Sequence, residues 1–291
     1  MPQDWLLVDD RDSLTHACSD IGKTNIIGID TEYDSFRYFR EKLCLIQIRA
    51  GSFTYLFDPL GTCDIAALAP LFADPNIIKV LHAGENDIRL LNRDYGFTFN
   101  SVFDTHRAAS LMGCTHLALT VLVDTYLGEA LGKSKSIQRS RWDTRPLAEE
   151  QIEYAVQDTR YLIALYRIMN EKLQNEGLTQ KAAEAFDKVT ATRWSEKKLD
   201  KGGYLKIKGA DELDGHQQDR LKILYCWRFR KAERTNRARF LILSDQDLIN
   251  LAAHHVDSLE SLHRSGLISP AKIESYGKEL ADLLNTAPSS H

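Results

Sequence analysis

Short apolar runs, several rich in β-branched residues, dominate the early part of the chain and are typical of strands. Four of these runs predict strands: Asn25–Asp30, Leu43–Ile48, Thr54–Phe57 and Ile77–His82. Apolar residues at helical spacing predict helices that alternate with the strands or follow them. The predicted helices are Ala66–Phe72, Glu85–Tyr95, His106–Met112, Leu117–Tyr126, Glu149–Leu173 and Thr179–Trp194. This order of elements predicts an α/β fold in which helices flank a mixed sheet.

The pattern changes after residue 195, where SEKKLDKGG predicts a linker and later strand signals nearly vanish. The remaining apolar spacing predicts helices over Gln217–Arg234, Gln246–Ala253, Leu259–Arg264 and Ala271–Leu284. Ser244 and Ser269 suit N-cap positions, and Pro270 suits the first position of a helix. We therefore predict an α/β domain over 1–195, a linker over 196–203 and a smaller all-α domain over 204–291.

Composition places the chain among soluble globular proteins, with 43% apolar and 27% charged residues in 291. The net charge of −4 does not indicate nucleic-acid binding by the molecule as a whole. One segment is nevertheless strongly basic, with Glu233 as its one acid. Its basic residues are Arg220, Lys222, Arg228, Arg230, Lys231, Arg234, Arg237 and Arg239. Such a run is typical either of a phosphate-binding surface or of a solvated helix face.

The five cysteines form no CxxC pair and no zinc spacing, a usage that suits a reducing compartment. The first residues, MPQDWLLVDD, lack the long apolar core of a signal peptide. No apolar run reaches the roughly 18 residues that a membrane span needs. We therefore expect a cytoplasmic protein.

Two acids stand at the end of the first predicted strand, in IIGIDTEYDSF. Asp30 and Glu32 are two residues apart, so their side chains leave the same face of the strand, whereas Ile27 and Ile29 point to the other. This arrangement suits a bridged metal ion, although a chance D-x-E would explain the pair by itself. Asp87 opens the next helix, where the helix dipole alone would also favour an acid.

A tyrosine and a further acid share one face of the helix predicted over Glu149–Leu173. Tyr154 and Asp158 lie at positions i and i+4, on the flank of the apolar stripe. That stripe comprises Ile152, Ala155, Val156, Leu162, Ile163, Tyr166 and Met169. An acid at this flank suits either the wall of a cleft or a surface interaction.

Taken together, the motifs resemble the DEDDy 3′–5′ exonucleases, and within them the ribonuclease D family. The shared features are the strand-borne D-x-E, Asp87 in LHAGENDIRLL, and Tyr154 with Asp158 in IEYAVQDTRYL. The likeness extends to LCLIQI, VFDT and KSIQRSRWDTRPL. In the last part, WRFRKAE, LILSDQDL and ESYGKEL resemble an HRDC domain, the helical module attached to ribonuclease D and to RecQ-type helicases.

The resemblance implies a ribonuclease H-like fold and a 3′–5′ exoribonuclease that uses two divalent metal ions, Mg²⁺ or Mn²⁺. Asp30, Glu32 and Asp158 would hold one ion, Asp30 would also reach the second, and Asp87 would assist directly or through water. Tyr154 would orient the attacking water. The products would be nucleoside 5′-monophosphates, and RNA 3′ ends, such as those of tRNA precursors, would be the substrates.

Candidate nucleic-acid contacts lie in both domains. In the first they are His82, Lys135, Gln138 and Arg145; in the second they are Arg228, Lys231, Arg234, Arg237 and Arg239. His82 would equally serve as a structural histidine, and Arg145 as the partner of an acid within the fold. We expect Trp142 to be a core residue. Two other functions stay open at this point: a DNA 3′–5′ exonuclease, and a non-catalytic nucleic-acid-binding protein on the same scaffold.

Overall fold

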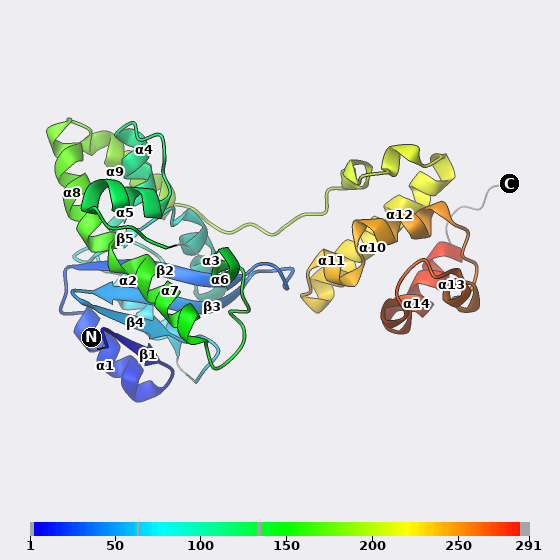
Figure 1. Ribbon diagram of the computed structural model, residues 1–291, viewed down its shortest axis with the longest axis horizontal. Coiled ribbons are helices and arrows are strands. Elements are labelled where there is room, and N and C mark those ends of the chain that lie inside the picture. Colours follow the sequence, from blue (N-terminus) through cyan, green and yellow to red (C-terminus); the bar gives the residue numbers. More distant parts are fainter. Residues whose placement is uncertain (1–2, 63, 133–134, 286–291) are drawn as a thin grey trace. The chain divides into compact units, whose positions relative to one another are not determined.

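A computed structural model describes residues 3–62, 64–132 and 135–285, which form two compact units (Figure 1). The first unit comprises residues 1–34 and 42–195. The second comprises residues 196–291 together with 35–41. None of the helices in the described ranges has the length and apolar character needed to cross a membrane.

A six-stranded mixed sheet forms the centre of the first unit, in the order β1-β4-β3-β2-β5-β6. The strands are β1 (Trp5–Val8), β2 (Ile26–Asp34), β3 (Lys42–Ala50), β4 (Phe53–Phe57), β5 (Ile78–Leu81) and β6 (Val102–Asp104). β2, β3 and β4 pair antiparallel, whereas β1 runs parallel to β4, β5 to β2 and β6 to β5. The structure thus confirms the predicted mixed sheet.

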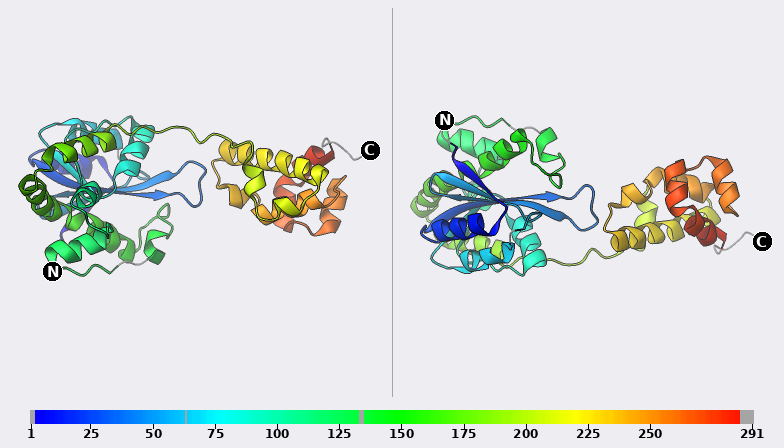
Figure 2. Two further views of the ribbon diagram at one scale, coloured as in Figure 1. Left: turned by 90° about the horizontal axis from the view of Figure 1, so that it is seen from above. Right: turned by 90° about the horizontal axis from the view of Figure 1, so that it is seen from below.

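Helices cover both faces of this sheet (Figure 2). Ile27 and Ile29 of β2 belong to the core that the sheet forms with α1 (Arg11–Ile21), α2 (Ala69–Ala73) and α3 (Glu85–Tyr95). The other face packs against α7 (Glu149–Arg160) and α8 (Leu162–Asn175). The remaining helices of the unit are α4 (Thr105–Leu111), α5 (Leu119–Leu127), α6 (Lys135–Gln138) and α9 (Thr179–Thr190), and a 3-10 turn, η1 (Ile65–Leu68), precedes α2.

A glycine on β2 lets the helical layer approach the sheet closely. A Cβ at Gly28 would lie 3.1 Å from the Cβ of Leu162 and 3.3 Å from the carbonyl oxygen of Thr159. These residues flank a break at Tyr161, which divides the single helix predicted over Glu149–Leu173 into α7 and α8. The last turn of α7 is therefore held against the strand that carries Asp30 and Glu32.

The second unit is helical, as predicted. Its elements are η2 (Gly203–Lys206), η3 (Ala210–Glu212), α10 (Gly215–Thr235), α11 (Arg239–Ile242), α12 (Asp245–Ala253), α13 (Leu259–Ser265) and α14 (Pro270–Asn285). The apolar faces of α10, α12 and α14 meet in one core that includes Leu221, Leu251 and Leu280. Ser244 caps α12 by accepting the backbone N–H of Asp247, and Pro270 is the first residue of α14, which confirms both assignments.

Candidate functional site

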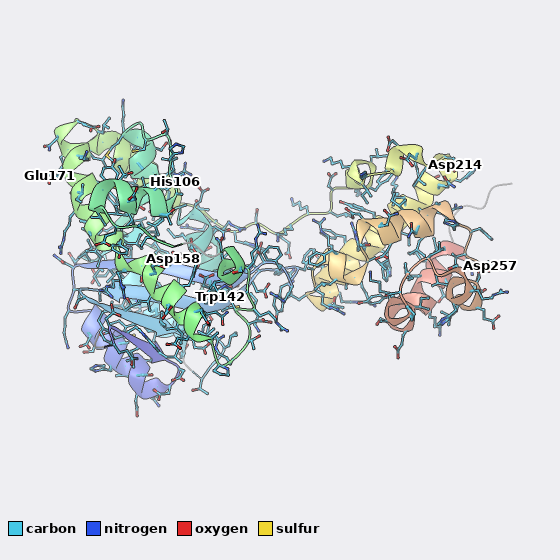
Figure 3. All side chains as sticks on the ribbon, viewed as in Figure 1. His106, Trp142, Asp158, Glu171, Asp214 and Asp257 are labelled. Carbon is cyan, nitrogen blue, oxygen red and sulfur yellow. The ribbon has the colours of Figure 1, made fainter. Side chains whose placement is uncertain are left out.

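Three carboxylates from two elements converge at one cavity of the first unit. β2 supplies Asp30 and Glu32, and α7 supplies Asp158. One oxygen atom from each lies within 4.8 Å of the others. They line a cavity of about 180 Å³, and Figure 3 labels Asp158 on α7. The strand acids and the helix acid, which the family resemblance implied would share metal ions, therefore meet in the fold.

The chemistry of this cluster suits a hard divalent cation. Glu32 is only 8% exposed, and Asp30 and Asp158 are half-buried. Ionised carboxylates so close together repel one another and have lost part of their hydration, which is costly unless a cation compensates the charge. Carboxylate oxygens are the ligands that Mg²⁺ and Mn²⁺ prefer. The residues present therefore fit a divalent-metal site.

Tyr154 lies one helical turn before Asp158 and donates a hydrogen bond to its carboxylate. Burial raises the pKa of the Tyr154 phenol, and the negative charges of Asp158 and Glu32 raise it further. The phenol is therefore neutral and presents an O–H group to the cavity. Tyr154 is more deeply buried than its predicted place on the flank of the stripe, because it belongs to the core cluster that α7 forms with the sheet.

Trp142 supports the ring of Tyr154. The ring centroids are 6.0 Å apart, and Trp142 is 1% exposed. Its indole N–H donates to the carbonyl oxygen of Gln138 at 3.3 Å, which ties α6 to the same cluster. The structure confirms Trp142 as a core residue, and its packing holds the tyrosine beside the acids.

Asp87 lies outside the group of three. Its carboxylate accepts a hydrogen bond from the hydroxyl of Thr31, the residue between Asp30 and Glu32. Burial raises the pKa of the Asp87 carboxyl to about 6; the hydrogen bond from Thr31 lowers it, and the charge of Asp104 raises it. The structure thus brings three of the four predicted ligands together and connects the fourth to the same strand through Thr31, a residue that spacing did not single out.

A sharp turn between β5 and α3 sets the position of Asp87. Ala83 has a left-handed φ of 54°, and a Cβ at Gly84 would lie 2.5 Å from a side-chain carbon of Leu81. Asp104, which is fully buried at the end of β6, accepts the backbone N–H groups of Gly84 at 2.8 Å and Ala83 at 3.3 Å. The acid of the VFDT motif therefore fixes the turn from which the helix of Asp87 begins.

Gln47 is a further polar residue that local spacing did not single out. It lies opposite Asp30 in the β2–β3 pairing, so the two side chains share a face of the sheet. Gln47 is fully buried, and its amide atoms have no hydrogen-bond partner among the described residues. The LCLIQI motif thus places a polar group beneath the site.

The nucleic-acid contacts predicted in the first unit differ in their distance from the acids. His82 and Gln138 line the cavity, whereas Arg145 does not. Its guanidinium pairs with the buried carboxylate of Asp58, Nη2 lying 2.6 Å from Oδ1, and also donates to the carbonyl oxygen of Cys44 at 2.7 Å. Arg145 thus forms an ion pair within the fold, the alternative that the sequence left open, and its contact with phosphate stays a prediction. The side chain of Lys135 lies outside the described part.

In the second unit, two of the five predicted contacts are committed to internal bonds. Arg228 is 5% exposed, donates to the carbonyl oxygen of Leu243 at 2.9 Å and pairs with Asp245 at 2.8 Å. Lys231 pairs with Glu279 at 2.5 Å, and only 11% of its side chain is exposed. Both cationic groups are thus bonded within the helical domain, and their contact with nucleic acid stays a prediction.

The other three predicted contacts lie nearer to solvent. Arg237 donates to the hydroxyl of Tyr276 at 3.1 Å. The side chain of Arg234 is 70% exposed and lies 4.0 Å from Glu279, and Arg239 is exposed at a cavity of about 720 Å³ within the second unit. Arg234 and Arg239 are therefore the members of the set best placed to meet a phosphate.

Comparison with known proteins agrees with this geometry. Residues 6–174 match the family described as 3′–5′ exonuclease, and residues 217–284 match the HRDC domain. Ribonuclease D of Shewanella sp. (strain ANA-3) is 32% identical over 285 residues, which cover 98% of this chain and 73% of that protein.

Two solved structures are similar over most of the chain. Escherichia coli RNase D, described as an exoribonuclease involved in structured RNA processing, is 28% identical with a TM-score of 0.74, over 99% of this chain and 76% of that one. The catalytic core of RRP6 from Trypanosoma brucei has a TM-score of 0.90 at 22% identity, over 98% of this chain and 80% of that one, and so matches in fold.

Proposed function

The chain belongs to the ribonuclease D family of 3′–5′ exoribonucleases, and from this premise we propose that it trims the 3′ ends of tRNA precursors with the help of two divalent ions. It is a hydrolase of phosphodiester bonds that carries an HRDC domain, and its substrate is RNA. The coarse chemistry, divalent-metal hydrolysis, follows from the family and from the acidic cluster.

One observation carries the proposal: the convergence of Asp30, Glu32 and Asp158 beside Tyr154 in a single cavity. These three carboxylates would hold the ions, with Asp87 close by through Thr31. The chemistry that paired divalent ions supply is activation of a water and stabilisation of the departing 3′-oxygen. The chain's own contribution is to hold the carboxylates and to place the phenol of Tyr154, which donates to Asp158, where it can hydrogen-bond and orient the attacking water.

The choice of substrate rests on the attached helical unit and on the relatives. One HRDC domain accompanies the exonuclease domain in this chain, and Arg234 and Arg239 are exposed cations on the second unit. We further propose a cytoplasmic location; the free cysteines among the described residues support it, since such thiols are typical of a reducing compartment.

The test uses purified protein, tRNA precursors with short 3′ trailers, and single-stranded DNA of equal length, each labelled at the 5′ end. We expect stepwise shortening of the RNA from its 3′ end with Mg²⁺ or Mn²⁺, release of nucleoside 5′-monophosphates, and no cleavage in chelator. Faster degradation of the DNA would instead indicate a DNA exonuclease. Absence of cleavage of either polymer by folded, metal-loaded protein would refute the assignment.

The exposed cations of the second unit should contribute to binding of long RNA. We expect the double substitution Arg234→Gln and Arg239→Gln to weaken binding, because each substitution removes a phosphate contact. Each lost contact should also make the dependence of log K on log salt shallower by about 0.7 for single strands. Fluorescence anisotropy at several salt concentrations, in the absence of hydrolysis, measures this slope.

A matched control removes the same charge from the first unit. Lys181 and Lys188 are exposed on α9, and Lys181→Gln with Lys188→Gln leaves the second unit unchanged. If both double variants shift the slope equally, the effect is one of overall charge. The cations of the HRDC domain would then have no specific part in binding RNA.

A further inference from the structure

The second unit contains a cavity that the proposed hydrolysis does not use. Its volume is about 720 Å³, and all of its lining residues belong to this unit. Its walls include parts of α10 and α11 and the segment 35–41, which groups with the helical unit. Clefts of roughly 300–1,000 Å³ hold small organic ligands in proteins. The cavity is therefore large enough for a ligand the size of a mononucleotide.

The wall contributed by the segment 35–41 is firmly joined to the helices of the unit. The backbone N–H of Ala238 donates to the carbonyl oxygen of Arg37 at 2.9 Å. Phe39 is buried in the helical core, where its ring meets the ring of Phe229 edge-on with the centroids 5.1 Å apart. This wall is therefore held by both a backbone bond and core packing.

The lining of the cavity is strongly cationic. Lys198 and Arg239 are exposed there, and within the described ranges neither forms an ion pair. The chain as a whole has a net charge of −4, so the cavity concentrates positive charge against the overall balance. One acid, Asp245, stands among five basic residues: Lys197, Lys198, Lys206, Arg228 and Arg239.

Arg228 adds a buried charge to this lining. The residue is 5% exposed, whereas the side chain of its carboxylate partner, Asp245, is 63% exposed. Its Nη1 bonds to Leu243 and Asp245, but its Nε has no hydrogen-bond partner among the described residues. A buried cation is costly unless an anion compensates it, and a solvated carboxylate does so weakly. An anion in the cavity would therefore be favoured by Arg228 as well.

Aromatic rings make up much of the remaining lining. They belong to Tyr38, Phe39, Tyr225, Phe229 and Phe240. Phe240 is 54% exposed, an unusual position for a large apolar side chain with no ligand to cover it. Nucleobases of every type stack on aromatic rings, and phosphates bind to lysine and arginine. An acidic peptide would use the cations but would leave the rings without a partner.

We propose that this cavity binds a 5′-phosphorylated nucleotide, with its base against Phe240 and its phosphate at Lys198 and Arg239. A nucleotide within an RNA strand and a free mononucleotide share this chemistry, and the experiment below distinguishes them. The inference does not involve the carboxylates of the first unit. It therefore stands whether or not the chain trims tRNA precursors.

The test measures binding by calorimetry at low salt in EDTA, so that no divalent ion is present and RNA stays intact. The ligands are adenosine 5′-monophosphate (AMP), adenosine, inorganic phosphate and an oligoadenylate of about twelve nucleotides. We expect AMP to bind at least about tenfold more tightly than adenosine or phosphate, because it meets both the rings and the cations. Phosphate that binds as tightly as AMP would mean a simple anion site and would overturn the proposal.

Two exposed positions separate recognition of the base from recognition of the phosphate. Phe240→Leu keeps an apolar side chain but removes the ring, and it should weaken AMP binding by about tenfold. Lys198→Gln removes one cation and should weaken it by about fivefold. The matched controls are Leu259→Ala on α13 and Lys278→Gln on α14, both exposed and outside the lining. They should bind AMP as the wild-type protein does, and an equal loss in variant and control would contradict the site.

The oligoadenylate identifies the source of the nucleotide. Binding at least about tenfold tighter than that of AMP, and weakened by both cavity variants, assigns the site to a nucleotide within a strand. Binding no tighter than that of AMP assigns it to a free mononucleotide. An oligoglutamate peptide that binds more tightly than either ligand would show a protein-docking surface instead and would overturn the proposal.

One further variant separates this site from the acidic cavity of the first unit. Asp158→Asn should bind AMP with wild-type affinity in EDTA, because the lining lies wholly in the second unit. A changed affinity would place AMP among the acids and would refute the inference. Failure of the protein to cleave RNA with Mg²⁺ would instead refute the proposed function, and it would leave the binding of AMP in EDTA unaffected.

Discussion

Asp158→Asn is expected to abolish hydrolysis while the protein stays folded. The amide keeps the shape of the side chain but removes one of three negative charges that lie within 4.8 Å of one another. Metal ions stabilise transition-state charge by several kcal/mol, so their loss should slow cleavage at least about a thousandfold. Initial rates on 5′-labelled RNA, with Mn²⁺ affinity measured by calorimetry, test both parts of this expectation. Asp30→Asn should behave in the same way.

A control on the same helix makes the result specific. Glu153 is exposed on α7, next to Tyr154, and Glu153→Gln changes the charge by the same amount as Asp158→Asn. It should retain wild-type cleavage and metal affinity. Circular dichroism and thermal unfolding establish that each variant is folded. Full activity in folded Asp158→Asn would mean that this carboxylate holds no catalytic ion.

The position of the carboxylates could be predicted because it depends on local geometry. Alternation along β2 places Asp30 and Glu32 on one face of the strand and Ile27 and Ile29 on the other. Helical spacing places Tyr154 and Asp158 one turn apart on one face of the helix. That the two elements meet depends on a third feature, which spacing does not reveal. Gly28 allows the end of α7 to approach β2, and its role is visible only when the two layers are seen together.

Several elements could not be predicted because their stability comes from distant partners. β1 has four residues and pairs with β4, and β6 has only three residues. Such short segments carry too little alternation to be recognised. The break at Tyr161 leaves the apolar stripe uninterrupted, so the periodicity extends through α7 and α8 as if they were one helix.

The partners of charged residues were harder still to predict. Arg145 lies 87 positions from Asp58 in the sequence, and no local pattern connects them. Arg228 lies in a basic run, yet it is buried and bonded to Leu243. Charge alone thus identifies a candidate contact, and only the fold shows whether the cation faces solvent or another side chain.

Tyr154→Phe is expected to slow cleavage by about a hundredfold, the cost of losing the orientation of a reacting group, and to leave metal affinity unchanged. The substitution keeps the aromatic ring that packs on Trp142 and removes only the O–H group. Burial is the largest cause of the raised pKa of the Tyr154 phenol, and it persists when cations neutralise the nearby acids. The residue therefore acts as a neutral hydrogen-bonding group that orients the water rather than as a base.

Single-turnover rates and Mn²⁺ titrations distinguish this role from metal binding. Tyr166→Phe, in which the altered ring packs on Phe103 away from the acids, is the matched control and should cleave at the wild-type rate. A weaker Mn²⁺ affinity in Tyr154→Phe would show that the phenol supports the ligands, since its hydrogen bond reaches the carboxylate of Asp158 directly. Unchanged rates would mean that the carboxylates position the water unaided.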